Sequence, residues 1–106
     1  MTRCATIACL LVVPTLLCGR AAGEVDFPRD IQPIFARHCA KCHIEKREGG
    51  LRLASRQDAL VAADSGEVVV EPGDSAASEL IRRITAEDDT RMPPEGERLA
   101  AAEVAL

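Results

Sequence analysis

The sequence predicts one small, mostly α-helical domain that follows a short apolar segment. With 106 residues, the chain has room for a single domain. Apolar residues recur at helical spacing in two stretches, around Ile34 and around Leu80. Phe27 and Phe35 are the only aromatic residues, since Trp and Tyr are absent. A core with so few rings is small, and a cofactor would make up the deficit.

The first helix is expected to begin near Ile31 and to run into the region of Cys39. Asp30 is the expected N-cap, and Pro33 is tolerated in a first helical turn. Residues 45–50 are charged and end in two glycines, which predicts a loop.

Two further helices are expected. Ser55 and Asp58 form a variant of the capping box that opens a short helix. Residues 68–70 predict an extended apolar piece. A longer helix follows, with Asp74 or Ser75 as its cap and with Leu80, Ile81 and Ile84 along one face. A polar loop over 87–94 comes next.

The last segment, residues 99–106, consists of helix formers and has no capping glycine or charged finish. We therefore expect the sequence to be truncated inside its final helix, as a fragment or as the leading module of a longer protein. The expected domain over 24–106 would then be incomplete at its C-terminus.

The first 23 residues predict a secretory signal. Arg3 gives a positive start, the chain is largely apolar from Cys4 to Cys18, and small residues precede Glu24. The apolar run is short for a membrane span. We expect export to the periplasm or to the outer side of the cytoplasmic membrane. An uncleaved signal would leave a membrane tether.

The charge pattern excludes nucleic-acid binding as an expected function. The formal net charge is −4, and acidic and basic residues are interspersed without a basic stripe. Removal of residues 1–23 would also leave only two of the five cysteines, Cys39 and Cys42.

The strongest motif is Cys39-Ala40-Lys41-Cys42-His43. Residues three and four apart share one face of a helical turn, so both thiols and the imidazole would point the same way. This arrangement is specific for covalent haem attachment, with two thioether bonds and His43 as an axial iron ligand.

Three other interpretations compete for the two cysteines. A structural zinc site usually needs four ligands, and the chain offers no second cysteine pair. A thioredoxin-like pair would require a βαβ context, which the sequence does not predict. A plain disulfide would form where haem attachment fails.

Met92 is the candidate for the second axial ligand. Pro93 and Pro94 stiffen the chain after it, and the only other methionine is Met1. A His/Met pair is typical of electron-transfer haem centres. His38 is the rival, but it adjoins Cys39 and is more simply a half-buried helix residue. Arg52, Arg56 and Arg91 are candidate partners for haem propionates.

Several further blocks accompany these residues: Val25-Asp26-Phe27, Asp30-Ile31-Gln32-Pro33-Ile34, Gly49-Gly50-Leu51-Arg52-Leu53, Pro72-Gly73, Ser78-Glu79-Leu80-Ile81-Arg82-Arg83-Ile84 and Arg91-Met92-Pro93-Pro94. With them the chain resembles the planctomycete-type cytochrome c domain. Ile44 stands where such cytochromes commonly have glycine, and Ala100 replaces the usual hydroxyl cap of the last helix.

The resemblance implies a small class I cytochrome c-like helical fold around one covalent haem c. It also implies that Cys39 and Cys42 bear the haem, with His43 and Met92 as iron ligands. The expected function is one-electron transfer rather than enzymatic catalysis. The expected partners are a redox protein or downstream domains of the same protein. The alternatives are a haem sensor or peroxidase-like site with a labile Met92, and a non-haem disulfide or zinc module.

Overall fold

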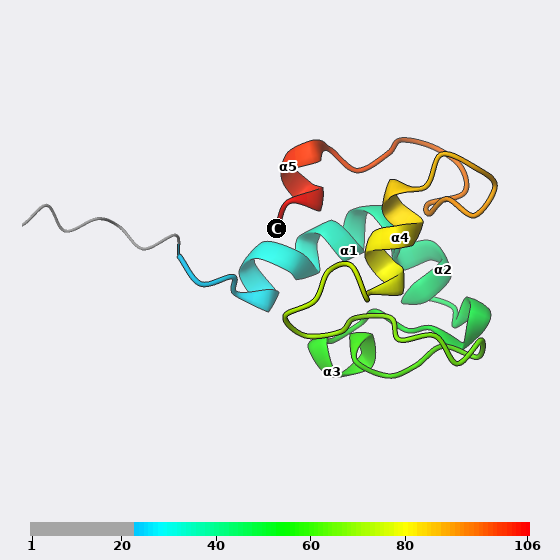
Figure 1. The fold of residues 1–106 in the computed structure, drawn as a ribbon, viewed down its shortest axis with the longest axis horizontal. Helices are drawn as coiled ribbons and strands as arrows, with labels where there is room; N and C mark the ends of the chain where they lie inside the picture. Colours follow the sequence, from blue (N-terminus) through cyan, green and yellow to red (C-terminus); the bar gives the residue numbers. More distant parts are fainter. Residues whose placement is uncertain (1–22) are drawn as a thin grey trace, which may run out of the picture.

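The computed structural model describes residues 23–106 (Figure 1). The predicted secretory signal lies, apart from Gly23, outside the described residues. Within 23–106 short helices are joined by long loops and no strand occurs, although Glu71 and Asp74 form one isolated antiparallel bridge. The predicted small helical domain is thus confirmed. None of the helices in this range is long and apolar enough to cross a membrane.

The first helical segment begins earlier than the sequence predicted. A wide π-helical turn, η1 (Phe27–Ile31), leads directly into α1 (Gln32–His38). Asp26 is the N-cap, and its Oδ1 accepts a hydrogen bond from the Arg29 N–H at 2.9 Å. The α-helix itself begins at Gln32, close to the predicted start near Ile31, but a helical turn precedes it and the predicted Asp30 cap is wrong.

The physical reason lies in the two prolines. Pro28 occupies the first turn, where a helix needs no N–H donor. Pro33 interrupts the hydrogen-bond ladder one turn later, because it has no N–H either. The wide turn takes up this interruption, with the Gln32 N–H bonding the Phe27 carbonyl five residues back. The prolines thus change the width of the helix without ending it.

The next elements surround the cysteine motif. Cys39 separates α1 from α2 (Ala40–His43) and ends the regular helix, with φ −121° and ψ −18°. The predicted loop follows and contains a 3₁₀ turn, η2 (Glu48–Gly50). Gly50 has φ +72°, and a Cβ there would meet the Asp64 carboxylate. The positive φ favours glycine here, and any larger residue would also have to displace the Asp64 side chain.

The predicted Ser55 cap is confirmed. Its Oγ accepts a hydrogen bond from the Asp58 N–H at 3.1 Å, and α3 (Arg56–Ala59) follows. The cap of α4 (Glu79–Thr85) differs from the prediction. Its first N–H groups, from Glu79 and Leu80, bond the carbonyls of Val68 and Val69 at 2.9 and 3.0 Å.

The predicted caps Asp74 and Ser75 therefore lie outside this helix. Asp74 instead accepts a hydrogen bond from the Ala77 N–H at 3.1 Å and closes the preceding turn. Ser78 is the N-cap by position, but its side chain faces the loop over 71–74. The segment at Val68 and Val69 replaces a local side-chain cap, because its carbonyls accept the N–H groups that the first turn of α4 leaves free.

The last helix, α5 (Ala101–Val104), lies on the side of α1 and α4 opposite to α3 (Figure 1). Ala100 has no side chain that caps this helix, and the Glu103 carboxylate accepts the Ala100 N–H at 2.8 Å instead. The same carboxylate bonds Arg37 at 2.9 Å and His38 Nε2 at 3.2 Å. Glu103 thereby connects α5 to α1.

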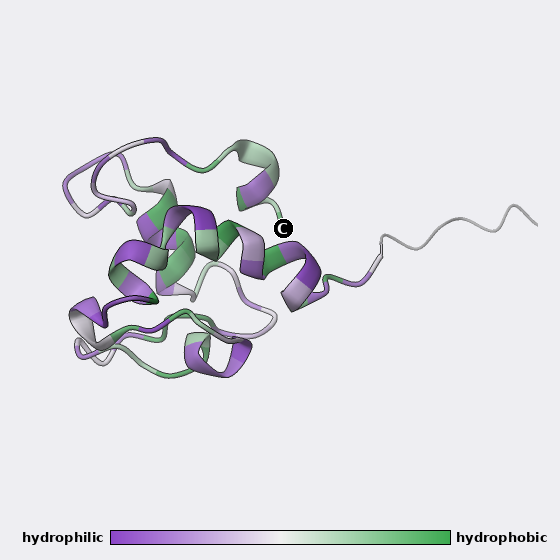
Figure 2. Cartoon of the chain, turned by 180° about the vertical axis from the view of Figure 1, so that it is seen from behind, coloured by the Kyte–Doolittle hydropathy of each residue, from purple (hydrophilic) through white to green (hydrophobic). Residues whose placement is uncertain are grey.

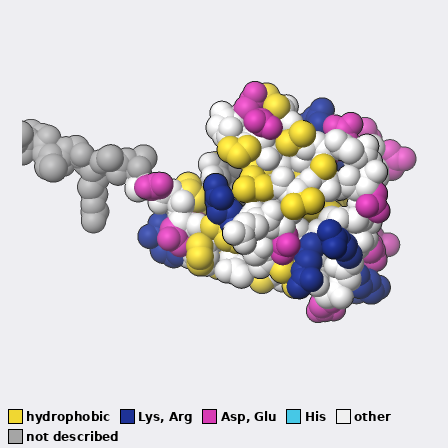
Figure 3. All heavy atoms as spheres, turned by 90° about the horizontal axis from the view of Figure 1, so that it is seen from below, with side chains coloured by type: hydrophobic (Ala, Val, Ile, Leu, Met, Phe, Trp, Pro, Cys, Tyr) yellow, Lys and Arg dark blue, Asp and Glu magenta, His cyan; other side chains and the backbone are white. Residues whose placement is uncertain are grey.

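The core lies under α1 and is small. Phe35, Leu53 and Ala59 form its centre, and Phe27 packs edge-to-face on Phe35 with ring centroids 5.8 Å apart. Figure 2 shows hydrophobic stretches along the helices and along the loops between α3 and α4. Hydrophobic side chains also remain at the surface among charged ones on the face drawn in Figure 3. The core is as limited as the scarcity of aromatic residues predicted.

Candidate functional site

A cavity of about 450 Å³ lies between α2, α4 and the loops that follow α2, α3 and α4. Cys39, Cys42, His43 and Met92 all contribute to its lining. The structure therefore brings together the four residues that the sequence singled out. Met92 comes from a loop far along the chain, so this convergence is a property of the fold and not of the motif alone.

The two cysteines lie one helical turn apart. The Cys42 N–H bonds the Cys39 carbonyl at 3.3 Å, and both thiols are free and half-buried. Burial, with a smaller contribution from Cys42, raises the pKa of the Cys39 thiol to about 11. Cys39 thus stays protonated at neutral pH, unlike the low-pKa thiolate of a redox-active pair.

His43 is oriented by the segment that follows the glycine turn. Its Nδ1 lies 3.2 Å from the Leu51 carbonyl oxygen. Because a carbonyl only accepts hydrogen bonds, this contact places a proton on Nδ1, and in the neutral ring Nε2 then keeps its lone pair. The His43 carbonyl in turn accepts the Leu53 N–H at 2.7 Å. The contact with Leu51 orients the ring and favours the tautomer that a metal ligand requires, and the bond from Leu53 holds the backbone of His43.

Met92 lies in the loop after α4. Its N–H bonds the Arg83 carbonyl at 2.9 Å, which attaches the loop to the last turn of the helix. Pro93 and Pro94 follow it along the cavity wall. A thioether on this anchored, proline-containing segment is available to a metal at the centre of the cavity.

The donor set and the walls fit a haem. Most of the cavity surface is apolar, and its lining includes the aliphatic residues Leu51, Leu53, Val69, Leu80 and Ile84. Two thiols, one imidazole with a free Nε2 and one thioether are the groups that haem c attachment and His/Met ligation use. Within residues 23–106 no three His, Cys, Asp or Glu side chains converge on one point as a metal cluster would.

A comparison with protein families bears on whether this cavity is a haem site. The model of the family described as Planctomycete cytochrome C matches residues 39–96, which is more than half of the chain. The chain belongs to this family. The match begins at the first cysteine of the motif and ends just past the Met92 loop. No curated protein and no solved structure matches the chain.

Membership of the cytochrome c family implies a haem c cofactor, and the cavity accommodates the chemistry of that group. The predicted propionate partners, however, are not on the cavity wall. Arg52 lies near Asp58 at 3.8 Å, Arg56 faces a second, apolar cavity, and Arg91 donates to the Pro94 carbonyl at 3.2 Å. Lys41 and Arg83 are the basic residues that line the cavity.

His38 is a half-buried helix residue, as predicted. The residue as a whole is half-buried, but its side chain is only 8% exposed; it also borders the cavity, with its Nε2 bonded to Glu103. Sequence reasoning missed Glu79 and Arg83, which lie together on the cavity wall. A signal was present, because Glu79 and Arg83 are four residues apart and Leu80 and Ile84 repeat the same spacing on the predicted helix.

Proposed function

We propose that this chain is a module with one covalent haem c that transfers single electrons. The observation that supports this proposal is the convergence of Cys39, Cys42, His43 and Met92 on one largely apolar cavity. Such a centre requires two attachment points, two axial ligands and an apolar lining that keeps water away from the haem.

Each residue has a distinct role in the proposal. Cys39 and Cys42 would hold the haem through thioether bonds, and His43 would bind the iron through Nε2. Met92 would bind the iron through its thioether and so keep exogenous ligands out. The haem supplies the one-electron redox chemistry when it is bound. Leu53 and Leu80 exclude water, which favours a small reorganisation of the site.

The proposed location is outside the cytoplasm, at the periplasmic or outer side of the membrane. The apolar segment over 4–18 and its positive start support this location. The proposed partner is a redox protein or another domain of the same protein. The module is an electron carrier in this proposal, and not an enzyme.

The test is expression of the full chain with a c-type haem maturation system. We expect an alkaline haemochrome spectrum and an intact mass raised by one haem. The double variant Cys39→Ser/Cys42→Ser should lose both signals. A purified wild-type protein without bound haem, despite competent maturation, would overturn the proposal.

Carbon monoxide separates electron transfer from the sensor alternative. We expect the reduced wild-type protein not to bind it, because Met92 occupies the sixth position. Met92→Ala should keep covalent haem and bind carbon monoxide. Binding by the wild type would instead assign the site to a sensor or peroxidase-like function.

A further inference from the structure

The loop that carries Met92 has two attachments to one residue of α4. The Arg83 carbonyl accepts the Met92 N–H at 2.9 Å, and the Arg83 guanidinium donates through Nη1 to the Thr90 carbonyl at 3.3 Å. Main chain and side chain of Arg83 thus hold two positions of the same loop. Arg83 itself lines the cavity into which Met92 faces.

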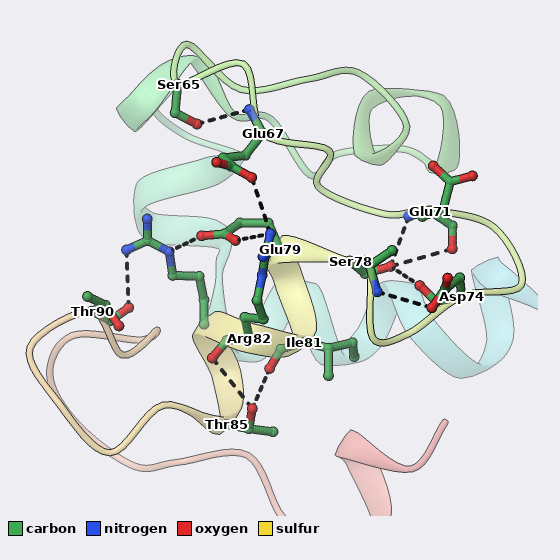
Figure 4. Close-up of polar contacts among 12 residues, drawn as sticks. Ser65, Glu67, Glu71, Asp74, Ser78, Glu79, Ile81, Arg82, Thr85 and Thr90 are labelled. Atoms are coloured by element: carbon green, nitrogen blue, oxygen red, sulfur yellow. Dashed lines mark hydrogen bonds and ion pairs between the residues drawn. The ribbon is translucent and has the colours of Figure 1, made fainter.

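The guanidinium is fixed from its other side. Its Nε donates to Glu79 Oε1 at 2.6 Å, and Glu79 is one helical turn earlier on α4. Figure 4 shows Glu79 on the helix and Thr90 on the loop, each joined by a dashed line to the guanidinium between them. The glutamate side chain is 20% exposed and that of Arg83 is 39% exposed, so water screens the pair in part, mainly on the arginine side.

The loop end of the bridge is also ordered. Asp88 Oδ1 accepts hydrogen bonds from the Thr90 N–H, at 2.9 Å, and from the Thr90 hydroxyl. These bonds close a short turn, so the Thr90 carbonyl is presented in one direction. A guanidinium suits this place because its planar fork can serve two acceptors at once.

We infer that Arg83 is a positioning residue for Met92, and that the Glu79–Arg83–Thr90 bridge sets how firmly the methionine holds the sixth iron position. This inference rests on the proposed function. Without the side-chain bridge, the loop keeps only the main-chain bond to Arg83 and swings away from the haem more often. The bridge then determines whether the iron is closed by Met92, as in an electron carrier, or is open to exogenous ligands.

Arg83→Gln in the haem-loaded full chain tests this inference, with Arg82→Gln as its matched control. Arg82 precedes Arg83 on α4 and shares its partner Glu79, at 2.7 Å, but its other ion pair is with Glu67 at 3.2 Å, whereas the bond to the Thr90 carbonyl comes from Arg83. Hydrogen bonds to charged groups have energies that correspond to changes on the order of tenfold or more in an equilibrium.

We expect Arg83→Gln to retain covalent haem and to bind imidazole on the order of tenfold more tightly in the ferric state. Its long-wavelength methionine-to-iron absorption band should weaken, and the Met92 amide should exchange its hydrogen faster. Arg82→Gln should match the wild type in all three measurements. Arg83→Lys keeps the charge but not the fork, and should show the same changes to a smaller degree.

If Arg83→Gln does not fold, Glu79→Gln and Arg83→Lys provide the same comparison. Wild-type imidazole affinity in the folded Arg83 variants, with the absorption band intact, would overturn the inference and leave the proposed function standing. An equal change in Arg82→Gln would also overturn it, because helix charge alone would then explain the effect. A wild-type protein without covalent haem would overturn both.

Discussion

Leu53 is the most deeply buried large side chain among the described residues, with 1% of its surface exposed. It contacts the core around Phe35 and also lines the cavity of the candidate haem site. Its N–H bonds the His43 carbonyl, so the backbone at this residue also supports the proposed axial ligand. A change at this one position therefore affects both packing and the site.

We expect Leu53→Ala to lower the free energy of unfolding by about 2–5 kcal/mol, because it removes buried methyl groups and leaves a cavity. Urea unfolding followed by circular dichroism measures this loss. Val61→Ala is the control, since Val61 is 56% exposed and its truncation should change stability by less than about 0.5 kcal/mol. Equal unfolding midpoints for the two variants would contradict the assigned core.

At the scale of elements, α4 depends on the loop that precedes it. Ser78 is 3% exposed, and its hydroxyl accepts the Glu71 N–H at 2.9 Å and donates to the Asp74 carbonyl at 2.8 Å. Figure 4 shows this serine between the two loop residues. The bonds hold the loop where Val68 and Val69 can cap the helix.

Ser78→Ala should therefore destabilise the protein by about 1–3 kcal/mol, because it leaves buried polar groups of the loop without their partner. Thermal unfolding measures the effect. Ser75→Ala, in the same loop but exposed, should unfold at the wild-type temperature. If both variants lose the same stability, the hydroxyl contacts of Ser78 do not support α4.

These elements also show what the sequence predicted and why other features escaped it. The haem motif and the Ser55 cap were predictable, because each is read from residues within one helical turn. The cap of α4 and the Arg83 bridge depend on segments that meet only in the folded chain. The π-helical turn before α1 was missed for a local reason, since Pro33 was assumed to need an ordinary α-helical first turn.

At the scale of the whole molecule, Glu103 joins the two ends of the described domain. Its carboxylate accepts the Ala100 N–H and contacts Arg37 and His38 on α1. The pKa of Glu103 lies below its ordinary value of 4.5. The largest cause is the hydrogen bond from the Ala100 N–H, and the contacts with His38 and Arg37 add to it. A carboxylate of this kind stabilises the fold above its unfolded pKa and loses that effect as the pH falls through its folded pKa.

We therefore expect wild-type stability to decrease as the pH is lowered from about 4.5 through the depressed folded pKa of Glu103. Glu103→Gln should be less stable than the wild type at neutral pH and should show a shallower decrease on acidification. Unfolding midpoints measured over a pH series test this expectation. Glu97→Gln, at an exposed position in the preceding loop, should follow the wild-type curve.

The Glu103 contact also bears on the order of events during biogenesis. His38 and Glu103 are 65 positions apart, so their pairing closes a long loop and forms late in a chain that emerges from its N-terminus. The thiols at 39 and 42 emerge well before that closure. Under the proposed haem attachment, a maturation enzyme would meet these thiols before the contact between α5 and α1 has formed.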